Sequence, residues 1–316
     1  MTNLTKSTRS AFIEALVEIG EVNKEVVTVA ADTRSRFGDF IKKFPERSFD
    51  VGIAEQTMIG VAAGLALCGK IPVVSTYANF LVFRAFEQIR VDVASRNLNV
   101  KLIGTDTGFS SEWFGFTHMA LEDMSAILSV PNIVIIDPSD PIETYYATLA
   151  IFDYPKPVYL RLRGRKEEPI LKREKKEFKI GKGEVLREGK DVVIITCGSS
   201  VYETMKAASF LETKGIKATI INMPTIRPLD YKLVEEIVIG TGTNKIVTVE
   251  AHNIRGLGSV ISEFIAEKLK GVSLLRIGVK DSFGIAGSED MLKKAFKLDE
   301  KSIALTIEEF LQIERT

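Results

Sequence analysis

The sequence has few of the residues that mark metal-binding or disulfide-bonded proteins. Its 316 residues include two cysteines, Cys68 and Cys197, and two histidines, His118 and His252. Two cysteines cannot complete a zinc site, and both lie in apolar stretches, so we expect buried, reduced thiols. The histidines are far apart in the sequence, so no local metal cluster is indicated. We expect no metal ligands in this chain.

The sequence also lacks a net charge and a long apolar run. Lys plus Arg and Asp plus Glu number 42 each, so charge does not favour nucleic acid or an anionic membrane as a partner. The longest apolar run, 58–68, is too short to span a bilayer, and the first residues lack a signal-peptide core. We therefore expect a soluble, cytoplasmic protein that binds neither nucleic acid nor membrane.

Strand-like runs alternate with helical patterns along most of the chain, which predicts parallel sheets covered by helices. The expected strands are 26–32, 71–77, 99–106, 132–137, 157–162, 191–200, 217–226, 245–253 and 272–279. The expected helices are 8–22, 54–68, 80–96, 119–129, 140–151, 201–214, 230–239 and 257–270, with another near the C-terminus. Residues 164–190 are rich in charge and read as a solvated linker with one short strand at most. The sequence predicts α/β architecture in two consecutive parallel-sheet sandwich domains, 1–178 and 179–316.

Three short stretches carry residues that could do chemistry. Glu55 opens an otherwise apolar helical segment, where it needs a partner unless the helix dipole alone explains it. Phe80, Phe83 and Phe86 recur every three residues after a strand; such a stripe is usually core, but the first two rings could wall a pocket for a flat heteroaromatic ring. The Gly-rich stretch 256–260 opens a helix as anion sites do, but its spacing favours simple close packing.

The order of several motifs resembles a known family. GIAEQ (52–56), NFLVF (79–83), GFTH (115–118) with LED (121–123), and VPNIVIIDPSD (130–140) follow one another as in the pyrimidine-binding domain of transketolases. DVVIITCGSS (191–200) and VEAHNIRGLGSVISE (249–263) are similar to the C-terminal domain of the same family. The resemblance extends over about residues 5–310 and implies thiamine diphosphate as the cofactor.

One family motif is missing from this sequence. Full-length transketolases carry a G-D-G…N motif that holds Mg²⁺ and the diphosphate of the cofactor, and no such motif occurs here. The resemblance therefore implies the C-terminal subunit of a split transketolase. A separate N-terminal subunit would hold the diphosphate and Mg²⁺, and the chain would also self-associate across a dimer, giving a heterotetramer.

The resemblance implies roles for individual residues. Glu55 would hydrogen-bond N1′ of the aminopyrimidine ring as the catalytic carboxylate, and Phe80 and Phe83 would pack on that ring. Phe86 is expected in the core. His118 would contact the substrate and take part in catalysis. Asp32 would lie near the cofactor, with a helix cap as the competing explanation. Sugar-phosphate substrates would be bound by Arg9, Ser35 and one of Arg163 and Arg165, between which the motif does not decide.

The loop before His118 departs from the family. Phe114 stands where transketolases have an aspartate that recognises the donor, Trp113 is beside it, and Asp106 replaces a histidine or small residue. We expect transfer of a two-carbon ketol unit from a ketose phosphate to an aldose phosphate, with altered donor recognition. The alternatives are decarboxylating transfer from a 2-oxoacid, as in deoxyxylulose-phosphate synthases or the beta subunits of 2-oxoacid dehydrogenases, and a non-catalytic scaffold.

Overall fold

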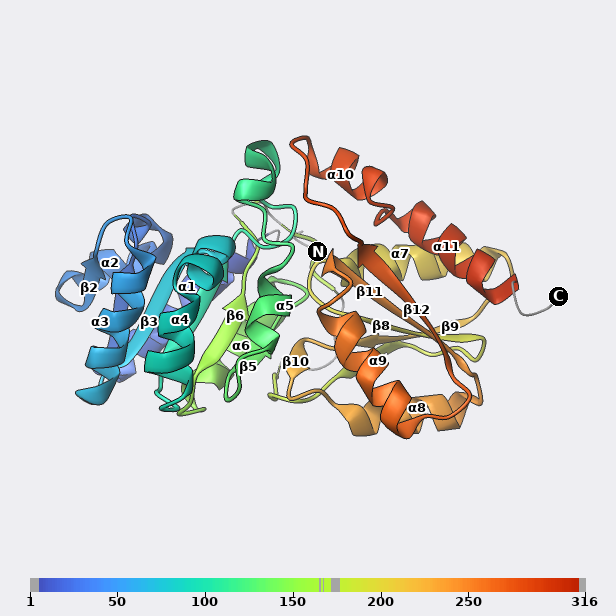
Figure 1. Cartoon of the computed structure of the whole chain (residues 1–316), viewed down its shortest axis with the longest axis horizontal. Helices are drawn as coiled ribbons and strands as arrows, with labels where there is room; N and C mark the ends of the chain where they lie inside the picture. The colour runs from blue at the N-terminus through green and yellow to red at the C-terminus, as the bar shows by residue number, and fades with distance from the viewer. Residues whose placement is uncertain (1–5, 165, 167, 172–176, 313–316) are drawn as a thin grey trace.

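Two β-sheets covered by helices form the protein (Figure 1), in a computed structural model that describes residues 6–164, 166, 168–171 and 177–312. The first sheet has seven strands in the order β10-β5-β6-β4-β3-β1-β2, and the second has five in the order β12-β11-β8-β9-β7. All strand pairs are parallel except β10 with β5 and β7 with β9, both at sheet edges. The predicted fold class is confirmed.

The strands of the first sheet are β1 (Val26–Ala30), β2 (Ser48–Asp50), β3 (Ile71–Tyr77), β4 (Lys101–Thr105), β5 (Val134–Ile136), β6 (Val158–Arg161) and β10 (Thr225–Arg227). Those of the second are β7 (Glu184–Arg187), β8 (Val192–Thr196), β9 (Ala218–Asn222), β11 (Lys245–Asn253) and β12 (Ser273–Val279). β1, β4, β5, β6, β8 and β9 are buried along their whole length, as continuous apolar runs predict for central parallel strands.

The α-helices are α1 (Thr8–Val22), α2 (Asp39–Lys43), α3 (Glu55–Leu67), α4 (Phe86–Gln88), α5 (Asp123–Leu128), α6 (Pro141–Phe152), α7 (Ser200–Thr213), α8 (Tyr231–Thr241), α9 (Leu257–Lys268), α10 (Glu289–Ala295) and α11 (Glu300–Gln312). Five short turns of other helix types are η1 (Arg34–Phe37), η2 (Pro45–Arg47), η3 (Phe80–Arg84), η4 (Ile89–Ala94) and η5 (Glu112–Thr117). No helix in the described ranges is long and apolar enough to cross a membrane.

Two elements differ from the sequence prediction. The expected helix 80–96 consists of two π-helical turns, η3 and η4, on either side of α4. Such π turns are rare and often occur at functional sites. The expected strand 217–226 is two strands, because the chain leaves the second sheet after β9 and continues as β10 beside β5 of the first sheet. A strand from the second half of the chain thus completes the first sheet.

Burial corrects two further expectations. Cys197 is buried but Cys68 is exposed, since it follows the last turn of α3, where Leu67 is also exposed. The prediction that both thiols are buried was wrong for Cys68, because the apolar helix has one uncovered face. The expected solvated linker also contains a buried acid, since Glu168 is 4% exposed and is paired with Arg163.

Candidate functional site

Four neighbouring parallel strands end at one edge of the first sheet. The order β4-β3-β1-β2 brings the residues that follow each strand into a row, because carboxyl ends of parallel strands meet at one edge. Glu55 follows β2, Asp32 follows β1, Phe80 follows β3, and the loop with His118 follows β4. The topology thus collects motifs that are up to about 85 residues apart in the sequence.

Asp50 shapes the two turns nearest the start of this row. Its carboxylate accepts hydrogen bonds from the backbone N–H groups of Asp32 at 3.0 Å, Arg34 at 3.2 Å and Gly52 at 2.8 Å. Gly52 has a φ of 74°, which glycine adopts without strain and which turns the chain from β2 into α3. The sequence reasoning missed this residue, although it stands two positions before the GIAEQ motif.

Glu55 is buried at the first position of α3, and its partner is an arginine. The Arg84 guanidinium donates to Glu55 Oε1 at 2.9 Å, while its carbon lies 3.7 Å from the centre of the Phe80 ring. The carboxylate is 4% exposed, whereas the Arg84 side chain is 45% exposed. A flat cationic group of the chain itself therefore rests on an aromatic face and hydrogen-bonds a buried carboxylate. The sequence analysis did not identify Arg84, because it lies inside an aromatic stripe.

The aminopyrimidine ring of thiamine diphosphate is also flat and hydrogen-bonding, so this arrangement suits it. Glu55 and Phe80 can offer that ring the same carboxylate and ring face that Arg84 uses in the structure. Phe83, the second predicted aromatic, is 51% exposed and presents its ring to the outside of the described chain. Phe86 is partly buried and packs against the hydrophobic core, as predicted.

His118 lies in an aromatic enclosure beside this pair. Its ring is 4.9 Å from Phe80, 5.2 Å from Tyr77 and 4.8 Å from Phe114, centre to centre, with Phe114 stacked on it. Burial and the positive charge of Arg84 lower the pKa of His118, and Asp106 opposes them. The imidazole is therefore neutral at physiological pH.

The Thr117 hydroxyl sets the tautomer of this imidazole. Thr117 Oγ1 lies 3.2 Å from the Phe114 carbonyl oxygen and 2.9 Å from His118 Nδ1. A carbonyl can only accept and the hydroxyl has one hydrogen, so Nδ1 donates to Thr117 when both bonds form. Nε2 is then left as an acceptor, suited to a sugar hydroxyl.

The other predicted ligands lie in different surroundings. Asp32 is exposed with a φ of 56°, and the N-cap of η1 is Thr33, so Asp32 does not cap that turn. Ser35 is exposed within η1, while Arg9 is buried in α1. Arg165 lies outside the described residues. Arg36, which was not predicted, lies over the Tyr77 ring at 4.1 Å and pairs with Asp106.

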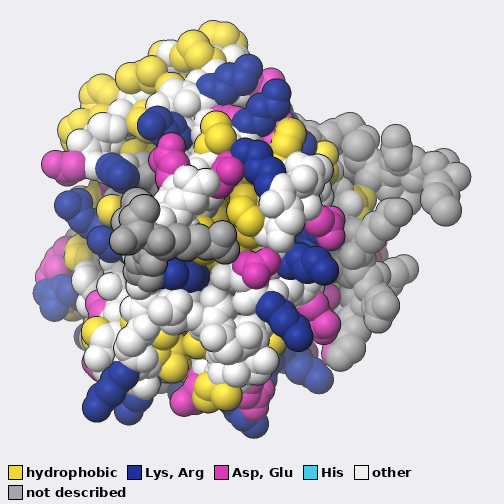
Figure 2. Space-filling model, turned by 90° about the vertical axis from the view of Figure 1, so that its right-hand side faces the viewer, with side chains coloured by type: hydrophobic (Ala, Val, Ile, Leu, Met, Phe, Trp, Pro, Cys, Tyr) yellow, Lys and Arg dark blue, Asp and Glu magenta, His cyan; other side chains and the backbone are white. Residues whose placement is uncertain are grey.

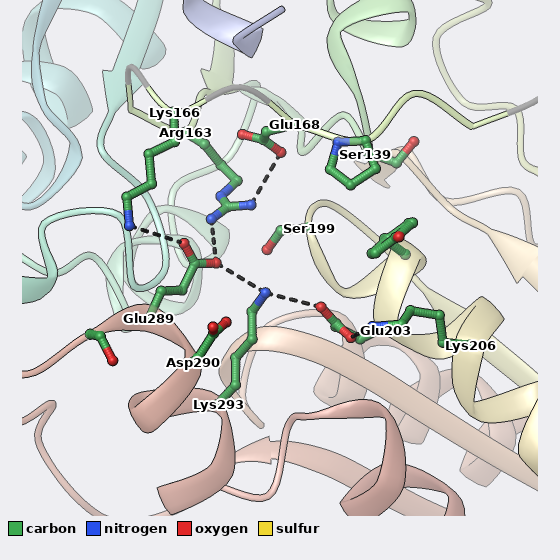
Figure 3. Close-up of a pocket in the computed structure, with 13 residues that line it drawn as sticks. Ser139, Arg163, Lys166, Glu168, Ser199, Glu203, Lys206, Glu289, Asp290 and Lys293 are labelled. Atoms are coloured by element: carbon green, nitrogen blue, oxygen red, sulfur yellow. Dashed lines mark hydrogen bonds and ion pairs between the residues drawn. The ribbon is translucent and has the colours of Figure 1, made fainter. Parts of the chain in front are cut away.

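Arg163 is held in a cavity between the two domains, of about 430 Å³ (Figure 3). Its guanidinium donates to Glu168 at 3.2 Å and to Glu289 of α10. These carboxylates raise the pKa of Arg163 despite burial. Burial raises the pKa of Glu289, but Arg163 and Lys293 outweigh it and bring it to about 2. Arg163 is thus neutralised by two carboxylates of its own chain.

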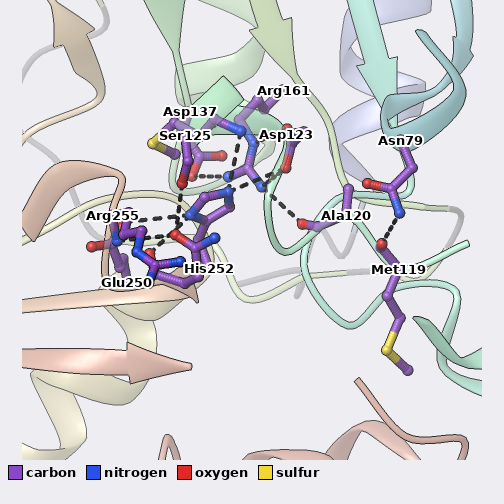
Figure 4. A network of polar contacts seen from close by, with 12 residues as sticks. Asn79, Met119, Ala120, Asp123, Ser125, Asp137, Arg161, Glu250, His252 and Arg255 are labelled. Carbon is purple, nitrogen blue, oxygen red and sulfur yellow. Dashed lines mark hydrogen bonds and ion pairs between the residues drawn. The ribbon is translucent and has the colours of Figure 1, made fainter. Parts of the chain in front are cut away.

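A second polar cluster, also between the domains, is fully buried (Figure 4). Arg161 donates to Asp123 at 2.8 Å and to Asp137 at 2.7 Å, and the buried His252 Nε2 accepts the backbone N–H of Met124 at 3.1 Å. Burial raises the pKa of Asp137, whereas Arg161 and His252 overcome burial and lower that of Asp123. A basic residue inside the apolar run 157–162 was the signal for this cluster, which the sequence analysis missed.

The Gly-rich start of α9 is occupied by a carboxylate of the chain. Glu250 accepts the N–H groups of Leu257 at 2.9 Å and Gly258 at 2.8 Å. A Cβ on Gly256 would lie 2.4 Å from a Glu250 oxygen, so glycine is needed for this close approach. Close packing, favoured from the sequence, is what the structure has. Among the described residues, no group of three or more His, Cys, Asp or Glu side chains could hold a metal ion.

Exposed aromatic and aliphatic side chains gather beyond His118. Trp113, Phe114 and Phe116 of η5 are 70%, 64% and 54% exposed, and Phe283 and Ile285, which precede α10, are exposed beside them. In Figure 2, hydrophobic side chains collect along the upper edge of the molecule, while charges of both signs are interspersed over the rest of that face.

Comparisons with known proteins bear on this architecture. The transketolase pyrimidine-binding domain family matches residues 5–166, and the transketolase C-terminal domain family matches 181–303. The chain belongs to the transketolase family. It covers 99% of a protein of Methanocaldococcus jannaschii named as a transketolase C-terminal section, at 39% identity over 99% of its own length. The predicted family, and the C-terminal section within it, are confirmed.

Other transketolase-family proteins extend this picture. One of the two subunits of an apulose-4-phosphate transketolase of Actinobacillus succinogenes is 38% identical over 92% of this chain and 94% of its own. A structure described as a split gene transketolase, inactive beta4 tetramer, is 36% identical with a TM-score of 0.87, over 98% of this chain and 99% of that one. A 1-deoxy-D-xylulose-5-phosphate synthase of Halothermothrix orenii is 36% identical, but this chain spans 47% of it.

Proposed function

We propose that this chain is the C-terminal subunit of a split, thiamine diphosphate-dependent transketolase that moves a two-carbon ketol unit from a ketose phosphate to an aldose phosphate. An N-terminal subunit would supply the diphosphate site and the Mg²⁺ ligands, and the chain would act only with it. The observation that carries the proposal is the buried Glu55 carboxylate, paired with a flat cation that rests on Phe80.

The residues of this chain have separate tasks in the proposed reaction. When bound, thiamine diphosphate supplies the carbon nucleophile and the electron sink. Glu55 holds a proton against N1′ of the aminopyrimidine ring, and Phe80 and Phe83 wall that ring. His118, neutral and with Nε2 free to accept, orients a hydroxyl of the substrate and takes its proton. Asp32 lies on the same sheet edge, near the proposed cofactor site.

Donor recognition should differ from that of other transketolases. Phe114 stacks on His118 where the family has an acceptor, so the site offers the donor an apolar surface in place of a carboxylate. Arg163 is already neutralised by Glu168 and Glu289, which leaves Arg9, Ser35 and Arg165 as the proposed phosphate ligands. We therefore expect a specialised donor. The name of the Actinobacillus relative, which specifies apulose-4-phosphate, is an example of such specialisation within the family.

Self-association is proposed through the uncovered face of α3. Gly60, Val61 and Gly64 are exposed on that helix, and a Cβ at either glycine would meet no atom within 4 Å. Small residues on one apolar face let two helices approach closely, and α3 begins at Glu55, so such a contact would adjoin the site. With the N-terminal subunit it would give a heterotetramer.

Two boundaries complete the proposal. We place the domain boundary at residues 178 and 179, between the two family matches, which end at 166 and begin at 181. We expect the enzyme in the cytoplasm, as an enzyme of carbohydrate metabolism, because its phosphorylated substrates do not cross membranes freely.

Calorimetry of thiamine diphosphate binding tests the proposal. The chain alone should bind weakly, and an equimolar mixture with a G-D-G…N subunit should bind tightly and only with Mg²⁺. The mixture should then convert a ketose phosphate and an aldose phosphate without releasing carbon dioxide. Release of carbon dioxide from a 2-oxoacid would favour the synthase alternative, while failure of the mixture to bind the cofactor would favour the scaffold.

A further inference from the structure

The loop that follows β4 reaches from the candidate site into the second domain. It closes on itself at residues 107–120, where the N–H of Gly108 donates to the Ala120 carbonyl at 3.0 Å. Its base is part of the core of the second domain, since Phe109 stacks on Phe296 with ring centres 5.5 Å apart. Its tip is η5, which carries Phe114 and leads into His118.

Burial gives the tip of this loop little hold. Its three aromatic side chains, Trp113, Phe114 and Phe116, are all more than half exposed. A segment with few buried apolar contacts opens at low free energy unless polar contacts fix it. The position of Phe114 on His118 therefore needs another anchor.

Glu112 is that anchor. Its side chain is 6% exposed and receives Lys166 Nζ at 2.7 Å on each carboxylate oxygen. Glu112 Oε2 also accepts the backbone N–H of Glu289 at 2.9 Å, and the Glu112 carbonyl accepts the N–H of Gly287 at 3.1 Å. Two of these donors are backbone groups of the second domain, just at the start of α10.

The segment 281–288, between β12 and α10, follows the loop beyond Glu112. Phe283 lies against Phe116 with ring centres 5.3 Å apart. Gly284 approaches so closely that a Cβ there would lie 2.5 Å from the sulfur of Met119. From the first domain, Asn79 of the NFLVF motif donates to the Met119 carbonyl. The loop is thus held between the β3 end of the site and segment 281–288.

We infer that Glu112 is a positioning residue that clamps the 112–117 tip to the second domain, so that the C-terminal domain takes part in donor recognition. The clamp keeps Phe114 stacked on His118 and fixes the aromatic face that the donor meets. The effect on the donor rests on the proposed function; the clamp itself does not.

Trp113 reports on the clamp directly, because it is the only tryptophan of the chain and is the neighbour of Glu112. Time-resolved fluorescence anisotropy of the full chain should show a larger amplitude of fast local rotation for Glu112→Ala than for the wild type. Glu112→Gln, which keeps an acceptor for the Glu289 N–H but loses the charge pairing with Lys166, should fall between them.

Glu203→Ala is the matched control. Glu203 is an equally buried acid of the same cavity, paired with Lys293 at 3.1 Å and Lys206 at 3.4 Å, and no described contact joins it to the loop. Its anisotropy should equal that of the wild type. Unchanged anisotropy in Glu112→Ala, or an equal change in Glu203→Ala, would overturn the clamp.

The assembled complex tests the second part. Glu112→Ala should raise the KM for the donor about 10- to 100-fold, the effect of a displaced binding group, and leave thiamine diphosphate affinity unchanged. An unchanged donor KM, or an equal loss of cofactor affinity, contradicts a role in donor recognition. Absence of turnover in the wild-type complex would instead count against the proposed function, and the anisotropy result would still stand.

Discussion

The two buried carboxylate–arginine pairs of this protein differ in how completely they are enclosed. Asp123 and Arg161 are both buried, and the guanidinium also meets Asp137 and the Ala120 carbonyl. Glu55 is equally buried, but the one arginine that the described chain offers it, Arg84, is nearly half exposed and carries no second carboxylate among its described contacts. The first pair is complete within the chain, whereas the second can open.

The difference separates structural charge from functional charge. A buried ion pair with every hydrogen bond satisfied fixes one arrangement of two domains, and removing a member is costly. A buried carboxylate with an exposed partner can exchange that partner for a ligand at small cost. The following variants test this distinction, and are ordered from the largest expected effect to the smallest.

Glu55→Gln should lower kcat of the assembled complex by about 10²- to 10⁴-fold, because the amide cannot exchange a proton with the cofactor ring. The unfolding midpoint of the isolated chain should change little, since glutamine can still accept a hydrogen bond from Arg84. Steady-state kinetics and denaturant unfolding measure the two effects. Glu87→Gln, an exposed acid on α4, is the control. Full activity of Glu55→Gln would refute the catalytic assignment.

Arg161→Met should reduce the free energy of unfolding by about 3–5 kcal/mol, because two buried carboxylates lose their cation. Arg90→Met, at an exposed pair with Glu87, should change it by less than about 1 kcal/mol. Urea unfolding followed by circular dichroism measures both. Equal effects of the two substitutions would show that burial does not distinguish these ion pairs.

Gly64→Leu should weaken self-association without destabilising the folded chain. A Cβ at Gly64 meets nothing within 4 Å, and leucine favours a helix over glycine by about 0.8 kcal/mol. Sedimentation equilibrium of the isolated chain should show a dissociation constant raised at least about tenfold, since the small face no longer fits its copy. Gly240→Leu on α8, equally open in the structure, is the control and should leave association unchanged. Unaltered association of Gly64→Leu would exclude this face of α3.

Arg84→Met should tighten thiamine diphosphate binding to the complex, by at most about fivefold, because the cofactor no longer displaces an exposed ion-pair partner. Calorimetry with Mg²⁺ measures the change, and Arg90→Met serves as the control. Weaker binding would mean that Arg84 holds the cofactor and does not stand in its place.

Sequence patterns predicted the sheet and the row of motifs along its edge better than the contacts between domains. Glu55, Phe80 and His118 follow strands whose apolar runs are local signals, so their meeting at one edge was foreseeable. Arg84 and Arg161 were missed because each lies inside an apolar or aromatic pattern that sets its position but not its partner. The contact of Glu112 with Glu289 joins residues of different domains, and no local pattern encodes it.

The path of β10 has a consequence for how this protein can be divided. Because β10 pairs with β5, the outer edge of the first sheet is supplied by residues 225–227, which lie well beyond the charged linker. A cut in that linker would leave the first domain with an unpaired sheet edge open to aggregation. The two domains therefore form one heritable unit, and a gene for this pair can be separated from its N-terminal partner far more easily than from itself.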